Sequence, residues 1–111
     1  MKLLLIEPTS QLVTQKKKFQ ILENSARKEY FDVPPLALGV LAGLTPPDWE
    51  IKIIQEPRDT VNFDEKADLV GITAVTHTAK RGYEIADEFR KRGINVIMGG
   101  IHPTVMFKEA L

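Results

Sequence analysis

Four short apolar runs, each bounded by polar or turn-forming residues, constrain the fold of this 111-residue chain most strongly. Runs of this length are typical of strands in a parallel sheet that is covered on both faces. They span Lys2–Glu7, Glu50–Gln55, Asp68–Thr73 and Ile94–Met98. Segments with helical signals separate most of them. Strands that alternate with helices predict parallel strands joined by right-handed crossovers.

The first predicted helix spans Leu36–Leu44. Pro34 and Pro35 open it, and the prolines at 46 and 47 end it. This helix is apolar nearly all round, so we expect it to pack in the core against the sheet.

A second helix follows Thr76 or Thr78, either of which could cap it, and Gly93 supplies its left-handed stop. Its charged residues, including Arg81, are expected to face water. Its apolar side, at helical spacing, consists of Ala79, Tyr83, Ala86 and Phe89. Gly99 and Gly100 end the fourth strand, and a last helix is expected to begin near Pro103.

These elements predict an α/β fold, namely a Rossmann-like, three-layer parallel sheet with the flavodoxin-like strand order 2-1-3-4. The apolar content of 43% suffices for one core, so residues 1–111 are expected to form one domain. Four strands are few for such a fold, and an uncovered apolar edge is a liability. We therefore expect a fragment of a longer protein, truncated after about four strands. Residues 8–33 form a long polar segment, which is typical of a functional loop.

Charge and composition exclude several classes of partner. Fifteen basic residues balance fifteen acidic ones, so no long-range field would attract nucleic acid or anionic lipid. The apolar start ends at Glu7 and Pro8, too early for a signal peptide, and no stretch is long enough to span a membrane. The absence of cysteine excludes disulfides, thiolate zinc sites and an iron–sulfur cluster held by this chain. We expect a cytoplasmic chain whose partner is a small molecule or another domain.

Ligands of open parallel sheets bind beyond the carboxyl ends of the strands, where the strand order reverses. For the order 2-1-3-4, this crevice lies between the first and third strands. The residues that leave the strand ends are 7–10, 73–77 and 99–104. They offer hydroxyls, two histidines and a glycine pair, but no catalytic cluster. We predict a binding rim with no catalytic residue and no metal ligand.

The glycine pair, Gly99 and Gly100, would let a bulky group approach the backbone closely, although a tight turn uses glycines in the same way. If Gly100 lines the ligand site, leucine at this position should weaken binding far more than it lowers the stability of the fold.

Other ligand-binding motifs fit poorly. The dinucleotide pattern GxGxxG and the phosphate loop GxxxxGK[ST] are absent. A receiver domain requires an aspartate where Thr73 stands. A flavodoxin-type phosphate loop would run from Thr9 and Ser10 directly into a helix, which here begins only at Leu36. A receiver-like or flavodoxin-like module that binds a protein or another small molecule stays as the alternative.

Three motifs occur in register along the chain: Pro34–Gly39, Ala67–Thr73 and Gly99–Thr104. Together they resemble the B12-binding domains attached to radical SAM enzymes. That group includes radical SAM methyltransferases and the anaerobic magnesium-protoporphyrin IX monomethyl ester oxidative cyclase. The resemblance implies cobalamin as the cofactor, with its nucleotide tail near the strand ends. By position, Thr73 matches a small hydroxyl residue that contacts the tail, and the two glycines make room for it. The predicted cofactor-binding residues are Thr9, Ser10, Thr73, Ala74, Val75, Gly99, Gly100 and His102.

Related cobalamin proteins carry Asp-x-His-x-x-Gly after the first strand, where this chain has Glu7–Ser10. The departure implies base-off cobalamin with no histidine of this loop on cobalt. His77 is expected to cap a helix or face solvent. For His102, contact with the cofactor or with a missing domain stands beside a hydrogen bond to backbone at the helix start. Lys16–Lys18 is expected to be a solvated face of the long loop.

The resemblance also implies that the parent protein continues into a radical SAM barrel. That barrel would hold a 4Fe–4S cluster on a three-cysteine motif and use S-adenosylmethionine, for methyl transfer or for oxidative cyclisation or rearrangement. Neither the barrel nor the cysteines are in this chain. We therefore expect the chain itself to be non-catalytic, with the corrinoid and the barrel as its partners.

Overall fold

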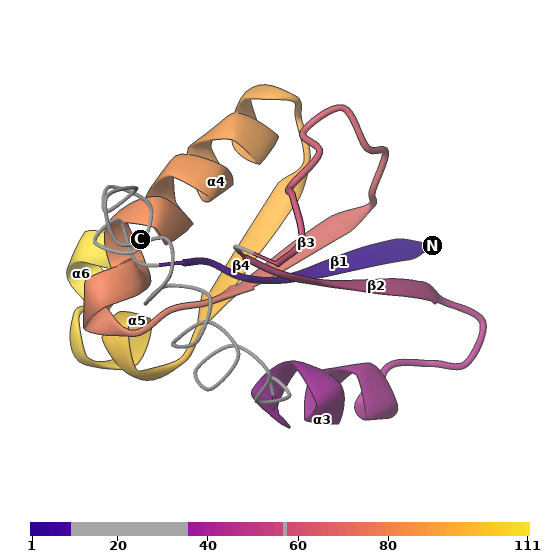
Figure 1. The fold of residues 1–111 in the computed structure, drawn as a ribbon, viewed down its shortest axis with the longest axis horizontal. Coiled ribbons are helices and arrows are strands. Elements are labelled where there is room, and N and C mark those ends of the chain that lie inside the picture. Colours follow the sequence, from indigo (N-terminus) through magenta and orange to yellow (C-terminus); the bar gives the residue numbers. More distant parts are fainter. Residues whose placement is uncertain (10–35, 57) are drawn as a thin grey trace, which may run out of the picture.

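The structure, a computed structural model, describes residues 1–9, 36–56 and 58–111. Its elements are β1 (Lys2–Glu7), α3 (Leu36–Leu44), β2 (Glu50–Gln55), β3 (Leu69–Thr73), the 3-10 turn η2 (Thr76–Thr78), α4 (Ala79–Lys91), β4 (Asn95–Gly99), α5 (Ile101–Val105) and α6 (Phe107–Ala110). The strands form one parallel sheet in the order β2-β1-β3-β4 (Figure 1). The predicted fold class and strand order are therefore confirmed. The predictions for Ser10, Lys16–Lys18 and the proline pair before α3 lie outside the described residues.

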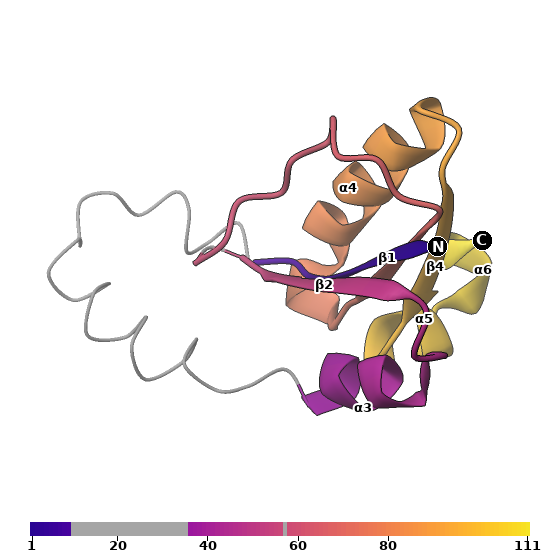
Figure 2. The same cartoon turned by 90° about the vertical axis from the view of Figure 1, so that its right-hand side faces the viewer.

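Helices lie on both faces of the sheet, with α4 on one face and α3 on the other (Figures 1 and 2). Strand alternation decides which side chains meet each helix. The core on the α4 side is the larger one and consists of Leu4, Ile6, Ile54, Val61, Val70, Ile72, Ile85, Ala86 and Phe89. The buried core on the α3 side consists of Leu3, Leu5 and Leu38. Among the described residues, the α3 side is thus the more sparsely covered face of the sheet.

Helix α3 has the predicted bounds, but the expectation that it packs in the core is wrong for most of its side chains. Leu38 is its one buried residue, whereas Leu36 and Leu44 are 76% and 78% exposed. A helix that rests on a sheet buries only the stripe that faces the strands. No element among residues 1–9, 36–56 and 58–111 covers the opposite stripe, which also carries Val40 and Leu41.

Helix α4 matches the prediction in extent, and its buried residues are Ala79, Gly82, Ile85, Ala86 and Phe89. Tyr83 is only partly buried, because Gly82 and Ile85 lie closer to the centre of the stripe that faces the sheet. Neither threonine caps the helix by its side chain. The Thr78 hydroxyl instead bonds back to the Val75 amide and carbonyl across η2 (3.1 and 3.2 Å). Gly93 provides the predicted left-handed stop, with φ of 76°.

The end of the chain differs slightly from the prediction. Strand β4 includes Gly99, and α5 begins at Ile101 rather than near Pro103, because the backbone reverses at Gly100. None of the helices in the described ranges is long and apolar enough to cross a membrane.

Candidate functional site

The carboxyl ends of β3 and β4 are joined by backbone hydrogen bonds that continue past the sheet. The Ala74 amide donates to the Gly99 carbonyl (3.0 Å), and the His102 amide donates to the Ala74 carbonyl (3.1 Å). These bonds place Thr73 and Ala74 beside the glycine pair. The structure therefore brings most of the predicted rim together at the left-hand end of the sheet in Figure 1, and Val75 continues from it into η2.

Gly100 is required by the backbone itself. Its φ is 99°, a conformation that residues with a Cβ atom rarely adopt. A Cβ atom here would lie 2.8 Å from the Ala74 carbonyl oxygen and 3.0 Å from the Thr73 hydroxyl. The expectation that leucine at position 100 would affect binding far more than folding is therefore wrong.

Gly99 differs from its neighbour because it faces open space. A Cβ atom at Gly99 would meet no atom of the described part of the chain within 4 Å, and no positive φ constrains the residue. Alternation along β4 puts Gly99 on the same face as Ile97, which is 59% exposed. This face is the one that α3 partly covers, since Gly71, the partner of Ile97, is also the partner of Leu5. Gly99, Ile97 and partly buried Thr73 thus form an open strip on the α3 side of β3 and β4.

Thr9, at the end of β1, is buried with an unsatisfied hydroxyl. The residue is only 5% exposed, and its Oγ1 has no hydrogen-bond partner among the residues that the structure describes. Its amide donates to Glu56 Oε1 over a long 3.4 Å. Buried polar atoms without partners are rare because each one has lost its hydrogen bonds to water. A polar group of a ligand would supply the missing partner.

An ion pair supports the end of β1 from α4. Arg81 donates from Nε and Nη2 to the two carboxylate oxygens of Glu56 (3.1 and 2.9 Å). The hydrogen bonds that Arg81 donates to Glu56 raise the pKa of Arg81, against the opposing effect of desolvation. The sequence predicts that Arg81 faces water. In the structure, Arg81 instead contacts the carboxylate of Glu56, a buried residue directly after β2. The helical periodicity of α4 did not predict this contact.

Glu7 is a half-buried carboxyl group on the α3 side of the sheet, by alternation from Leu3 and Leu5. Desolvation raises the pKa of Glu7, and a hydrogen bond with Gln55 opposes that effect. The carboxyl edge of the sheet on this side therefore combines the Glu7 carboxyl group, whose pKa is raised, with the Thr73 hydroxyl and the open face of Gly99.

The two histidines of the chain are in different environments. His77 is exposed in η2. His102 is 8% exposed, with Nδ1 3.4 Å from Thr76 Oγ1 and Nε2 3.1 Å from Glu109 Oε1. The Tyr83 hydroxyl donates to the same Glu109 oxygen (2.8 Å). The hydrogen bond from His102 is the largest cause that lowers the pKa of Glu109, and the hydrogen bond from Tyr83 is the next. The sequence offered no clue to these partners, because they belong to separate elements.

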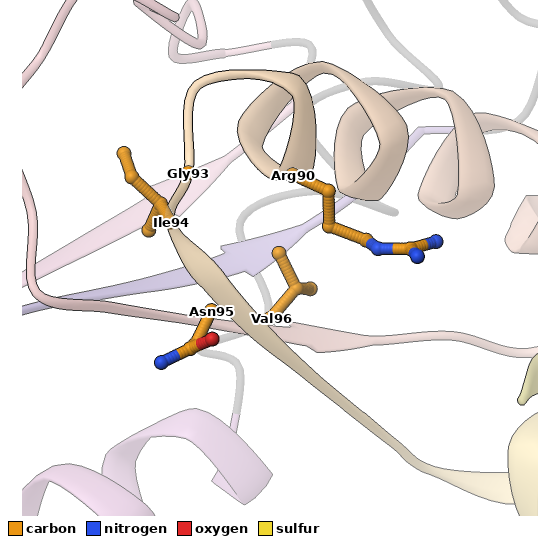
Figure 3. Close-up of a pocket in the computed structure, with 5 residues that line it drawn as sticks. All are labelled: Arg90, Gly93, Ile94, Asn95 and Val96. Carbon is orange, nitrogen blue, oxygen red and sulfur yellow. The ribbon is translucent and has the colours of Figure 1, made fainter.

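A hollow of about 300 Å³ lies at the other end of β4 (Figure 3). Arg90, Gly93, Ile94, Asn95 and Val96 line it. These residues precede or begin the strand, so the hollow is separate from the predicted rim. In the described ranges, no three side chains of the metal-ligating types come close enough to hold a metal ion.

Comparison with known proteins gives two relatives. Over 76 residues, the chain is 51% identical to the bacteriochlorophyllide d C-8(2)-methyltransferase of Chlorobaculum tepidum. Over 78 residues, it is 36% identical to the bacteriochlorophyllide d C-12(1)-methyltransferase of the same organism. Each match covers 68% of this chain and 17% of the relative. No family model matches the sequence, and no solved structure is significantly similar to it. The chain is therefore similar, over most of its length, to a small part of two much longer methyltransferases.

Proposed function

We propose that this chain is the corrinoid-binding module of a methyltransferase that acts on a chlorin pigment. The 51% identity to a bacteriochlorophyllide d methyltransferase supports the parent reaction. The motifs around Thr73 and Gly99 support cobalamin as the ligand, through their resemblance to B12-binding domains. The chain would hold the cofactor, and the rest of the parent protein would hold the pigment.

The observation that carries the proposal is the open face of Gly99 beside Thr73 on the α3 side of the sheet. A flat or bulky group can reach the backbone there, because no side chain or helix among the described residues fills the space. The unsatisfied Thr9 hydroxyl is a second feature that fits a ligand with many polar groups. Cobalamin has a nucleotide tail and several amide side chains, so it could satisfy both.

The roles of individual residues follow from this fit. Gly99 would admit the nucleotide tail, and Thr73 would donate or accept a hydrogen bond there. Gly100, Ala74 and Val75 would shape the turn around it, and the Thr9 hydroxyl would bind a polar group of the cofactor. Bound cobalamin would supply the methyl-transfer chemistry.

We further propose that cobalt carries no histidine of this chain. The chain has two histidines, and neither belongs to the loop after β1. His77 is exposed in η2, and both ring nitrogens of His102 already lie near Thr76 and Glu109. Base-off cobalamin without a protein imidazole agrees with this distribution.

The parent protein would also need the parts that the resemblance implies, namely a radical SAM barrel with a 4Fe–4S cluster and S-adenosylmethionine. The names of both relatives place the methyl group on carbon. The barrel would pack near the carboxyl edge of this sheet and present the pigment to the cofactor.

Titration with aquocobalamin, followed by visible absorbance, tests the proposal. Saturable binding with a spectral change is the expected result. A parallel titration with cobinamide, which lacks the nucleotide tail, should give weaker binding if the tail occupies the strip beside Gly99. Absence of binding by both corrinoids would favour an interaction module instead.

A further inference from the structure

Four side chains form a bracket around the turn after β4. The bracket consists of Thr76 in η2, Tyr83 in α4, His102 in α5 and Glu109 in α6. The His102 ring lies between Thr76 and Glu109, and Tyr83 donates to the same carboxylate oxygen that His102 approaches. The Tyr83 and His102 rings also meet edge to face, with centroids 6.1 Å apart. The bracket therefore links α5 and α6 to two elements that follow β3.

The backbone of His102 belongs to the same connection. Its amide donates to the Ala74 carbonyl (3.1 Å), and its own carbonyl accepts from the Met106 amide (2.8 Å). Gly100 lies two residues before it, in the strained φ region that the reversal requires. Helices of five and four residues have little stability of their own. Side-chain contacts such as those of His102 must therefore hold this segment in place.

The geometry argues against a direct role of His102 on a ligand. The ring is buried, and each nitrogen is within reach of a hydrogen-bonding partner from the chain itself. Nε2 can donate a hydrogen bond to the Glu109 carboxylate. Nδ1 can form a longer, weaker hydrogen bond with the Thr76 hydroxyl, which can act as donor or acceptor. A metal or cofactor contact would require His102 to give up one of them.

We infer that His102 is a positioning residue, which holds the Gly99–Gly100 turn through Thr76, Glu109 and Tyr83. The consequence for binding rests on the proposed function, because the turn forms one wall of the corrinoid site. The bracket itself does not depend on the ligand. It keeps the open face of Gly99 in a fixed shape before any ligand arrives.

Variants of Glu109 and His102 test the bracket while leaving the sheet intact. Glu109→Ala removes the shared acceptor, whereas Glu109→Gln retains an amide oxygen that Tyr83 and His102 can both use. Lys108→Ala, on the exposed surface of the same short helix, is the matched control. His102→Ala removes the ring. All five proteins, the wild type included, are compared by amide hydrogen exchange over residues 99–106 and by titration with aquocobalamin.

We expect exchange in residues 99–106 to be about tenfold faster in Glu109→Ala and His102→Ala, the effect of losing one or two net hydrogen bonds. Corrinoid affinity should fall about tenfold in these two variants, and Glu109→Gln should stay within about twofold of wild type. The electron paramagnetic resonance spectrum of bound cob(II)alamin should show no axial nitrogen in wild type or in His102→Ala.

Two results would overturn the inference. Unchanged exchange in both Glu109→Ala and His102→Ala would show that the bracket does not hold the turn. An axial nitrogen signal that is present in wild type and lost in His102→Ala would make His102 a cobalt ligand. If wild type binds no corrinoid, the proposed function fails, and the exchange measurements still decide whether the bracket exists.

Discussion

Gly100 packs against Ala74 so closely that a Cβ atom on the glycine would lie 2.8 Å from the alanine's carbonyl oxygen. A Cβ atom on the neighbouring Gly99 would have no other atom of the described residues within 4 Å. Two adjacent glycines therefore serve different purposes. Gly100 allows the chain to reverse, and Gly99 leaves a face of the sheet open.

The first prediction separates these purposes. Gly99→Leu should weaken corrinoid binding more than about tenfold by filling the open strip, while the free energy of unfolding changes by less than about 1 kcal/mol. Gly100→Leu should destabilise the domain by about 1–3 kcal/mol or more, through the positive φ and the contact with Ala74. Calorimetric titration and urea unfolding measure the two effects.

Gly43→Leu is the control for this prediction. Gly43 also faces open space, but it lies near the end of α3, which leads to the amino end of β2. Corrinoid affinity should be unchanged in this variant. Equal affinity in Gly99→Leu and wild type would remove Gly99 from the site.

The unsatisfied Thr9 hydroxyl gives the second prediction. Thr9→Val keeps the shape of the side chain and removes a buried hydroxyl that has no partner within residues 1–9, 36–56 and 58–111. Without ligand, we expect the free energy of unfolding of Thr9→Val to equal that of wild type or to exceed it by about 1 kcal/mol. The corrinoid affinity of the variant should be lower than that of wild type. Thr78→Val is the contrasting control, because the Thr78 hydroxyl bonds to Val75, so its removal should cost about 1 kcal/mol. Loss of stability in Thr9→Val would mean that its hydroxyl is satisfied.

The raised pKa of Glu7 gives a prediction about pH. Desolvation raises this pKa above its usual 4.5, so the folded state binds the proton more tightly than the unfolded state. Glu7 therefore makes the domain less stable as pH rises from about 4.5 through the folded pKa. Glu7→Gln removes this effect. The stability of the variant relative to wild type should be higher at pH 7 than at pH 4, as measured by urea unfolding. A difference that does not change with pH would contradict the burial of the carboxylate.

The Glu56–Arg81 pair should contribute to stability through its two hydrogen bonds. Arg81→Met leaves the carboxylate of Glu56 buried without its partner, at a cost of about 1–3 kcal/mol, less than for a fully buried pair because Arg81 is partly solvated. Arg90→Met removes an exposed partner of Asp87 and should cost less than about 0.5 kcal/mol. Thermal unfolding of both variants tests the difference. Similar losses would show that the Glu56 contact adds nothing beyond a surface pair.

The strands and their order could be predicted from sequence, because short apolar runs separated by helical segments admit few parallel topologies. The environment of α3 could not, since an apolar helix has the same pattern whether one side or both are covered. The different roles of Gly99 and Gly100 depend on a backbone angle and on the position of Ala74, which no local pattern encodes. Likewise, Glu109 contacts His102 only because the helical conformation is interrupted at Met106, between α5 and α6.

The most direct test of the proposed corrinoid site is the binding of aquocobalamin by the 111-residue chain, measured by visible absorbance. Gly99→Leu and Gly43→Leu are measured in parallel. We expect saturable binding by wild type and Gly43→Leu, a spectrum typical of base-off cobalamin, and much weaker binding by Gly99→Leu. The absence of any spectral change in folded wild-type protein, or equal binding by all three proteins, would contradict a corrinoid site at the Gly99 strip.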